Sequence, residues 1–298
     1  MAYRLKRGES VMEGVKRIAR QEIESSVQYL RGKGGVTTET AVHETRKSIK
    51  KTRAVLRLVR PGLGEIYAST NARLQQSGHE LSELRDAGAL IVTFDNLRKN
   101  DKKLTGSSLA PIRHVLVLHK KHLEEEYRAQ KIFEKIVDRL ADVRQSVKKW
   151  RLDKDGFAAI RPGLKQTFRS GRKALAGALK SGSREDFHEW RKRVKDHWYH
   201  VRLLEKVWTD VMQGYEHSLK ELEDALGEDL NLAILRERIL ALPEPAGGGH
   251  AADRLVSAID AARKERRAHA LEIGERVYAE KPGQLIRQIG RFWDAWHR

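Results

Sequence analysis

Apolar residues recur along this chain at every third or fourth position, with charged residues between them, and no segment keeps the alternation of a β-strand. This spacing predicts amphipathic helices. Segments rich in Gly or Pro separate the helices, as at residues 32–35 and 60–62. The predicted helices span about residues 9–30, 38–60, 63–83, 86–98, 111–150, 157–180, 184–207, 210–226, 229–242, 251–280 and 283–297. The pattern therefore predicts an all-α fold.

Individual polar residues and prolines indicate where several of these helices begin. Asp86 and Asp229 are expected to cap the helices that follow them. Pro111 suits the first turn of a helix. The long segment 111–150 is expected to be kinked or divided, and residues 243–249 are expected to form a flexible loop.

The chain carries one eight-residue pattern twice. HETRKSIK begins at His43, and HEWRKRVK begins at His188, 145 residues later. The match continues without a gap through Arg57 and Arg202, each of which lies in a run of the form aliphatic-Arg-Leu-aliphatic. A repeat of this length indicates two copies of one structural unit rather than a short solenoid repeat.

The polar segment 152–156 contains Gly156 and is the best boundary between the two copies. We therefore predict a first repeat over residues 1–151 and a second over residues 152–298, packed together as one larger pseudo-symmetric domain.

On a helix, the basic residues of each copy fall on one face, with apolar residues on the opposite face. The stripes consist of His43, Arg46, Lys47, Lys50 and Arg57 in the first copy and of His188, Arg191, Lys192, Lys195 and Arg202 in the second. Neither stripe contains Asp or Glu. Like charges at i,i+4 destabilise a helix, so we expect an anion to relieve the repulsion. A stripe about 21 Å long, from His43 to Arg57, suits several successive phosphates better than one small anion.

A basic stripe on a single helix is usually a solvated face, but its repetition in the same phase favours a ligand. Other basic residues, and one tyrosine on the second stripe, are expected to join a single groove or pore lined from both halves. They are Lys16, Arg20, Lys120, Lys121, Arg161, Lys165, Arg172, Tyr199, Arg266 and Arg267.

The composition agrees with a polyanionic partner. The formal net charge is +18 and the isoelectric point is about 10.0, which favours nucleic acid, polyphosphate or an anionic membrane surface as the partner. The chain has no cysteine, which excludes disulfides and thiolate metal sites. It has no run of about 18 apolar residues and no secretory signal pattern, so we expect a cytoplasmic protein that does not span a membrane.

Metal binding and catalysis find little support in the sequence. His197 and His200 are spaced i,i+3, but no carboxylate completes a metal site with them. Glu44 and Glu189 are expected to orient neighbouring Lys and Arg side chains. A phosphohydrolase needs clustered carboxylates for Mg²⁺ or an activated nucleophile, and the stripes have neither. We therefore predict that the protein is not an enzyme and holds no metal or cofactor.

The duplicated pattern His-Glu-x-Arg-Lys-x-aliphatic-Lys resembles the CHAD domain, the "conserved histidine α-helical domain", over nearly the whole chain from about Glu9. The resemblance implies two four-helix-bundle repeats related by a pseudo-twofold axis, which bind inorganic polyphosphate on a basic central surface without catalysis. It also implies phosphate or sulfate ions as mimics of the ligand, polyphosphate-processing enzymes as partners, and polyphosphate granules as a location.

Two alternatives remain at this point. Sequence-independent binding of nucleic acid shares the electrostatics, but it requires exposed aromatic side chains on which bases stack. The other alternative is an accessory subunit of an enzyme that processes polyphosphate or triphosphate, or a polyphosphatase itself.

Overall fold

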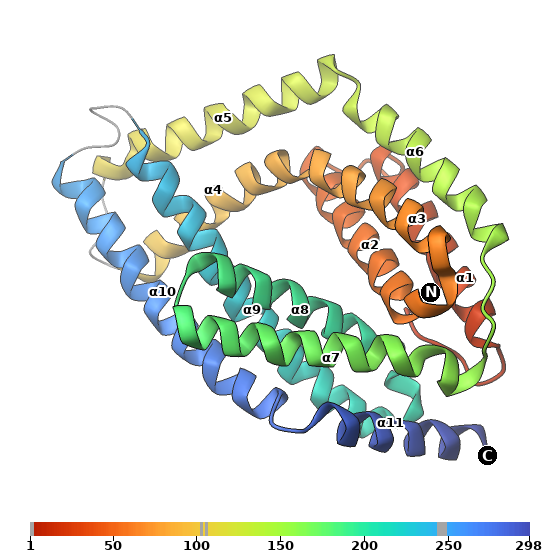
Figure 1. The fold of residues 1–298 in the computed structure, drawn as a ribbon. Coiled ribbons are helices and arrows are strands. Elements are labelled where there is room, and N and C mark those ends of the chain that lie inside the picture. Colours follow the sequence, from red (N-terminus) through yellow and green to blue (C-terminus); the bar gives the residue numbers. More distant parts are fainter. Residues whose placement is uncertain (1–2, 102–103, 105–106, 243–248) are drawn as a thin grey trace.

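The computed structural model describes residues 3–101, 104, 107–242 and 249–298, which are helical over most of their length (Figure 1). The helices are α1 (Val11–Leu30), α2 (Thr38–Leu58), α3 (Arg60–Glu80), α4 (Ser82–Asn100), α5 (Ala110–Ala129), α6 (Ile132–Ser146), α7 (Gly156–Ser181), α8 (Arg184–Leu203), α9 (Thr209–Leu240), α10 (His250–Val277) and α11 (Pro282–His297). Short 3₁₀ turns occur at Ser107–Leu109, Val147–Lys149 and Glu205–Val207. The described ranges contain no strand, and the predicted all-α fold is confirmed.

The segment 111–150 is divided, as predicted. Pro111 lies in the first turn of α5, and the chain turns between α5 and α6 at Lys131, whose backbone is left-handed with φ 52°. The predicted loop at residues 243–249 lies outside the described residues except for its last residue, Gly249.

Both predicted aspartate caps are wrong. Helix α4 begins at Ser82, directly after α3, so Asp86 lies within the helix, where it pairs with Arg85 at 3.0 Å. Helix α9 continues through Asp229, which is buried and pairs with Arg263 and Arg267 on α10, each at 3.0 Å. In both cases the carboxylate makes an ion pair instead of a cap. Asp86 pairs with the residue directly before it, whereas the partners of Asp229 come from another helix.

The helices of the two halves pair in corresponding ways. Helix α1 packs against α2 as α7 packs against α8, and α6 returns to α1 as α11 returns to α7. Thr37 caps α2 and Ser183 caps α8 through their hydroxyl groups, which accept from the backbone N–H three residues later. This arrangement is compatible with the predicted pseudo-symmetric repeat, while the division of the chain at residue 151 stays a prediction.

Helix α2 packs directly against α7 and α8 of the second half. His200 Nε2 on α8 donates to the carbonyl of Ala54 at 2.8 Å. Gly163 on α7 lies so close to the end of α2 that a Cβ at this position would come within 2.0 Å of the Leu58 carbonyl oxygen. Only glycine permits this approach of two backbones, so Gly163 sets the distance between α2 and α7.

Two separate apolar cores join the halves. The larger one contains Trp150, Phe168 and Trp190 and connects α1, α2, α3, α6, α7, α8 and α11 with parts of α4, α5, α9 and α10. The smaller one, here called the distal core, is formed where α4 and α5 meet α9 and α10, around Phe94 and Leu235. Figure 1 shows α4 and α5 extending from the block of α1–α3 to reach the ends of α9 and α10.

Because Phe94 is fully buried in the distal core, the substitution Phe94→Ala is expected to cost about 3–5 kcal/mol of stability. The loss should be local. Hydrogen exchange should accelerate in α4, α5 and α10, while α1, α2, α7 and α8 keep the protection of the larger core. Equal acceleration in all helices would contradict the existence of two separate cores.

Candidate functional site

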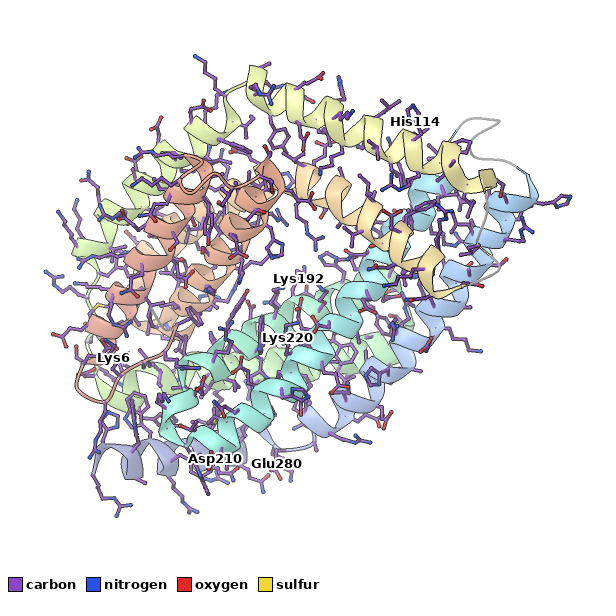
Figure 2. The ribbon with its side chains drawn as sticks, turned by 180° about the vertical axis from the view of Figure 1, so that it is seen from behind. Lys6, His114, Lys192, Asp210, Lys220 and Glu280 are labelled. Atoms are coloured by element: carbon purple, nitrogen blue, oxygen red, sulfur yellow. The ribbon has the colours of Figure 1, made fainter. Side chains whose placement is uncertain are left out.

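A pocket of about 390 Å³ lies between α2, α4, α8 and α9, and we call it the central pocket. Its lining residues are His43, Arg46, Lys47, Lys50, Arg85, Arg191, Lys195, Trp198, Tyr199, Lys220, Glu223, Asp224, Gly227, Glu228 and Asn231. Both motif helices therefore present basic side chains to one space. Figure 2 shows Lys192 on α8 and Lys220 on α9, on neighbouring helices of the second half.

The lining carries an excess of positive charge, with seven Lys and Arg side chains against three carboxylates. Two of the seven, Arg85 on α4 and Lys220 on α9, are absent from the predicted stripes because they lie outside the repeated pattern. The carboxylates Glu223, Asp224 and Glu228 all come from α9. The stripes themselves are free of acids, but the pocket is not.

Glu223 neutralises much of the second stripe. Its Oε1 lies 2.7 Å from both Arg191 Nη2 and Lys195 Nζ. Burial acts to raise the pKa of Glu223, but Arg191 and Lys195 outweigh it and lower this pKa to about 2, so the carboxylate stays ionised. Gly227 is one turn further along α9. A Cβ there would come within 3.1 Å of the Arg191 guanidinium, so this glycine makes room for Arg191 against the helix backbone.

The first stripe has no such acid at Lys50. Among the described residues, no hydrogen bond or ion pair is made by the Lys50 ammonium group. Burial, followed by the nearby charges of Lys195, Arg46 and Arg191, lowers the pKa of Lys50 well below its ordinary value. The Nε atoms of Arg46 and Arg191 are also buried and lack a partner within the described part of the protein. The pocket thus concentrates positive charge and hydrogen-bond donors that an anion would satisfy.

The two motif histidines differ in position. His43 lines the central pocket, whereas His188 does not, and both side chains are only partly removed from water. Burial lowers the pKa of His43, and Lys47 and Arg85 add to this effect against the opposing influence of Glu44. Burial also lowers the pKa of His188, with Lys192 as the next cause. In both cases the lowered pKa makes protonation of the imidazole harder in the free protein than for an isolated imidazole.

Aromatic residues close one side of the central pocket. Tyr199 is only 2% exposed and stacks on Trp198, with ring centroids 4.8 Å apart. Arg202 and Lys220 lie 5.1 and 5.7 Å from the Trp198 ring centroid. Arg202 is not among the lining residues and pairs with Glu216 at 3.1 Å.

A second pocket, of about 400 Å³, adjoins the central pocket and shares its walls at His43, Arg85, Glu228 and Asn231. Two further predicted residues lie here. Lys120 pairs with Glu39 at 2.7 Å, and Arg266 pairs with Glu228 at 2.6 Å.

The remaining predicted residues lie outside these two pockets. Arg20 on α1, Arg161 and Lys165 on α7, and Lys121 on α5 are exposed. Lys16 also lies on α1 and donates to the Lys148 carbonyl at 3.3 Å. The reason is geometric: α1 and α7 pack on the motif helices through their apolar faces, which leaves their basic faces outside the pocket.

The other outlying residues have specific partners. Lys192 pairs with Glu189, and Arg172 donates to the Glu280 carbonyl at 2.9 Å. Arg267 pairs with Asp229 and lies 4.2 Å from the Phe187 ring centroid, and Arg57 pairs with Asp196 at 2.6 Å. A role in ligand binding for any predicted site residue, inside or outside the pockets, stays a prediction.

His197 and His200 are fully buried core residues. Burial lowers the pKa of His197 to about 3 and that of His200 to about 4, so both are neutral. Within the described ranges, no three His, Cys, Asp or Glu residues are grouped so that they could hold a metal ion. Within the same ranges, no helix has the length and hydrophobicity to cross a membrane.

Fold and pocket together define an all-α protein in which two similar helices face a common basic pocket. The chain belongs to the CHAD domain family, whose model matches residues 27–240. Polyphosphate binding is the known property of this family. The fold is similar to that of PptA from Streptomyces chartreusis, with a TM-score of 0.56 and 15% sequence identity over 93% of this chain and 99% of that one. No curated protein matches the chain in sequence.

The unequal surroundings of Lys50 and Lys195 give a stability prediction. Lys50→Met removes a charge surrounded by other cations. It is therefore expected to increase the free energy of unfolding of the free protein by about 1 kcal/mol, which raises the melting temperature. Lys195→Met removes a partner of Glu223 and is expected to destabilise by about 1–3 kcal/mol. Thermal unfolding at neutral pH and low salt measures both. The same direction of change for the two variants would contradict this account of the pocket's charges.

Proposed function

We propose that this protein binds inorganic polyphosphate in the central pocket and does not catalyse a reaction on it. The observation that carries the proposal is the half-buried cluster of Arg46, Lys50, Arg191 and Lys195, in which Lys50 lacks a carboxylate partner among the described residues. Charge of this density favours a multivalent anion, because each added phosphate satisfies further donors. Membership of the CHAD domain family supports the same ligand.

The shape of the basic surface supports an extended ligand. From His43 to Lys50 the lining residues of α2 extend over roughly 10 Å along the helix axis, and the adjoining pocket adds Lys120 and Arg266. Arg side chains bind phosphate oxygens through two N–H groups at once, and Lys side chains add mobile point charges. A chain of linked phosphates can use all of these groups, whereas a single phosphate cannot.

The aromatic residues of the central pocket favour polyphosphate over nucleic acid. Binding of single-stranded nucleic acid relies on aromatic faces that are open to bases. Here Tyr199 and Trp198 stack on each other, and Arg202 and Lys220 lie over Trp198. The rings are also buried, with exposed fractions of 2% and 8%. A ligand without bases fits this lining better.

The carboxylates of the pocket support binding rather than catalysis. Glu223 pairs with Arg191 and Lys195, Asp224 with Lys220, and Glu228 with Arg266. Mg²⁺-dependent phosphoryl transfer needs carboxylates that coordinate the metal, whereas all three carboxylates here form ion pairs with basic side chains. On this proposal, polyphosphate granules in the cytoplasm are the expected location, and enzymes that process the polymer are the expected partners.

Lys50→Gln tests the site, because Lys50 has no acid that the substitution would leave unpaired. Its affinity for long-chain polyphosphate is expected to fall about tenfold or more, the loss of one charge-assisted contact. The slope of log affinity against log salt should decrease by roughly one. Titration calorimetry at several salt concentrations measures both quantities.

Lys173→Gln is the matched control, because Lys173 is an exposed residue of α7 outside the pockets, and it should leave the affinity almost unchanged. Equal losses for the two variants would refute the central site. Competition adds a test of the ligand: displacement of polyphosphate by RNA or DNA of matched charge, with equal efficiency, would favour nucleic acid instead.

The affinity is also expected to increase several-fold as the pH is lowered from about 8 to about 6. Burial keeps the pKa of His43 below its ordinary value in the free protein, and a bound polyanion favours the protonated imidazole. Binding therefore takes up a proton, and linkage requires tighter binding at lower pH. Calorimetry in buffers of different ionisation enthalpy measures this uptake. His43→Gln should reduce the uptake, and a variant that retained it in full would show that His43 does not titrate on binding.

A further inference from the structure

A larger pocket, of about 860 Å³, lies where the C-terminal end of α2 meets α3, α7 and α8. We call it the arginine pocket. It is lined by Arg57, Arg60, Pro61, Gly64, Tyr67, Ala68, Pro162, Gly163, Gln166, Thr167, Ser170, Arg193 and Asp196. None of these residues lines the central pocket.

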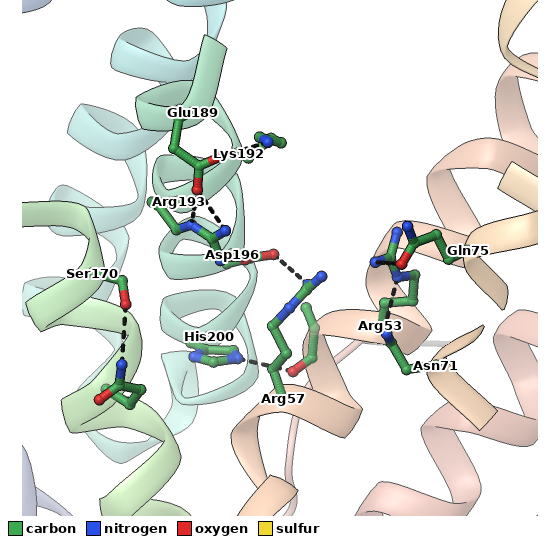
Figure 3. Close-up of polar contacts among 12 residues, drawn as sticks. Arg53, Arg57, Asn71, Gln75, Ser170, Glu189, Lys192, Arg193, Asp196 and His200 are labelled. Atoms are coloured by element: carbon green, nitrogen blue, oxygen red, sulfur yellow. Dashed lines mark hydrogen bonds and ion pairs between the residues drawn. The ribbon is translucent and has the colours of Figure 1, made fainter. Parts of the chain in front are cut away.

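Arg57, Arg60 and Arg193 line the arginine pocket, and Arg53, one turn before Arg57 on α2, lies beside it without being a lining residue. Two of these four guanidinium groups are paired with acids. Arg57 lies 2.6 Å from Asp196, and Arg193 lies 2.5 Å from Glu189 and 3.8 Å from Asp196. Figure 3 shows the Arg57–Asp196 contact between α2 and α8 and the Arg193–Glu189 contact within α8, with Arg53 one turn before Arg57.

The other two guanidinium groups lack an acidic partner among the described residues. Arg53 donates to the neutral side chains of Asn71 and Gln75, at 3.0 and 3.3 Å. Burial, followed by the charge of Arg57, lowers the pKa of Arg53 to about 10. Arg60 lies over the ring of Tyr67, 4.9 Å from its centroid. The cluster therefore has a net positive charge that the protein does not neutralise.

The chemistry of the lining favours phosphate groups without an attached base. Arg side chains bind phosphate oxygens in a bidentate way, and Gln166 and Ser170 add neutral polar groups, linked to each other at 3.3 Å. Arg60 covers one face of Tyr67 and so competes with a stacked base for that face. The volume of about 860 Å³ leaves room for more than one phosphate.

Helix α2 connects the arginine pocket to the central pocket. Arg53 and Arg57 follow Arg46 and Lys50 by seven residues, so the four side chains lie along one face of the helix. The step from Lys50 to Arg57 is roughly 10 Å along the helix axis. An extended phosphate chain can follow this row of cations from one pocket toward the other.

We propose that the arginine pocket is a second phosphate-binding site that holds the same polyphosphate chain beyond the central pocket. This inference rests on the proposed function. Chains long enough to reach both pockets are held at two places, and their affinity exceeds that of short chains because the second contact is intramolecular. Arg53 and Arg60 carry the site, since neither is committed to a carboxylate.

The test compares the double variant Arg53→Gln/Arg60→Gln with the control Arg254→Gln/Arg291→Gln, which removes two exposed arginines of α10 and α11. Two probes are titrated, long-chain inorganic polyphosphate and tripolyphosphate. The double variant is expected to lose about tenfold or more in affinity for the long chain. It should bind one tripolyphosphate where the wild type and the control bind two. A second variant, Arg53→Lys/Arg60→Lys, keeps the charge but loses the bidentate geometry. Its loss of long-chain affinity should be smaller, and it tests the site even if the glutamine variant fails to fold.

Two results would overturn the inference. One is a long-chain affinity of the double variant equal to that of the control. The other is the loss of one tripolyphosphate site without any loss of long-chain affinity, which would make the arginine pocket an independent anion site. Failure of the proposed function is recognised separately, because it appears as an unchanged long-chain affinity of Lys50→Gln.

Discussion

The main constraint on this structure is the repulsion between like charges that the fold holds close together on half-buried side chains of the central pocket. Arg46 and Lys50 on α2 face Arg191 and Lys195 on α8, and their mutual repulsion acts to separate the two helices. Apolar contacts oppose that separation on two sides, the larger core around Trp190 and the distal core around Phe94. Because each core contains residues from both halves, the helices remain in place, and the positive charge is available before any ligand arrives.

The two copies of the motif divide this task unequally. In the second copy, Glu223 pairs with Arg191 and Lys195 and so fixes the positions of both cations. In the first copy, Lys50 has no comparable acid within the described residues and keeps its attraction for an anion. The second copy therefore holds its cations in fixed positions, whereas the first copy carries most of the positive charge that no acid neutralises. A fully paired pocket would be more stable but would offer less binding energy to a polyanion.

The repeat was the most informative signal in the sequence, because its in-phase basic residues predicted two helices of the same type that face one ligand. Residues whose role comes from another helix were not predictable. Asp86 and Asp229 resemble helix caps in sequence, yet both lie within continuous helices. The partners of Asp229, Arg263 and Arg267, come from α10. Arg85, Lys220 and Glu223 follow no repeated spacing, so only the packing of α4 and α9 brings them to the pocket.

The different surroundings of Lys50 and Arg57 follow from the way α2 crosses its neighbours. Both residues lie on one face of α2. Near Lys50 the neighbours of that face are α4, α8 and α9, whereas near Arg57 they include α7 and α8. The two pockets share no lining residue, and α7 contributes only to the one near Arg57, where Gly163 allows it to touch the end of α2. A single stripe in the sequence thus becomes two basic sites in the fold. Helical periodicity alone places residues on a face, and the crossing of a third helix decides whether that face forms one site or two.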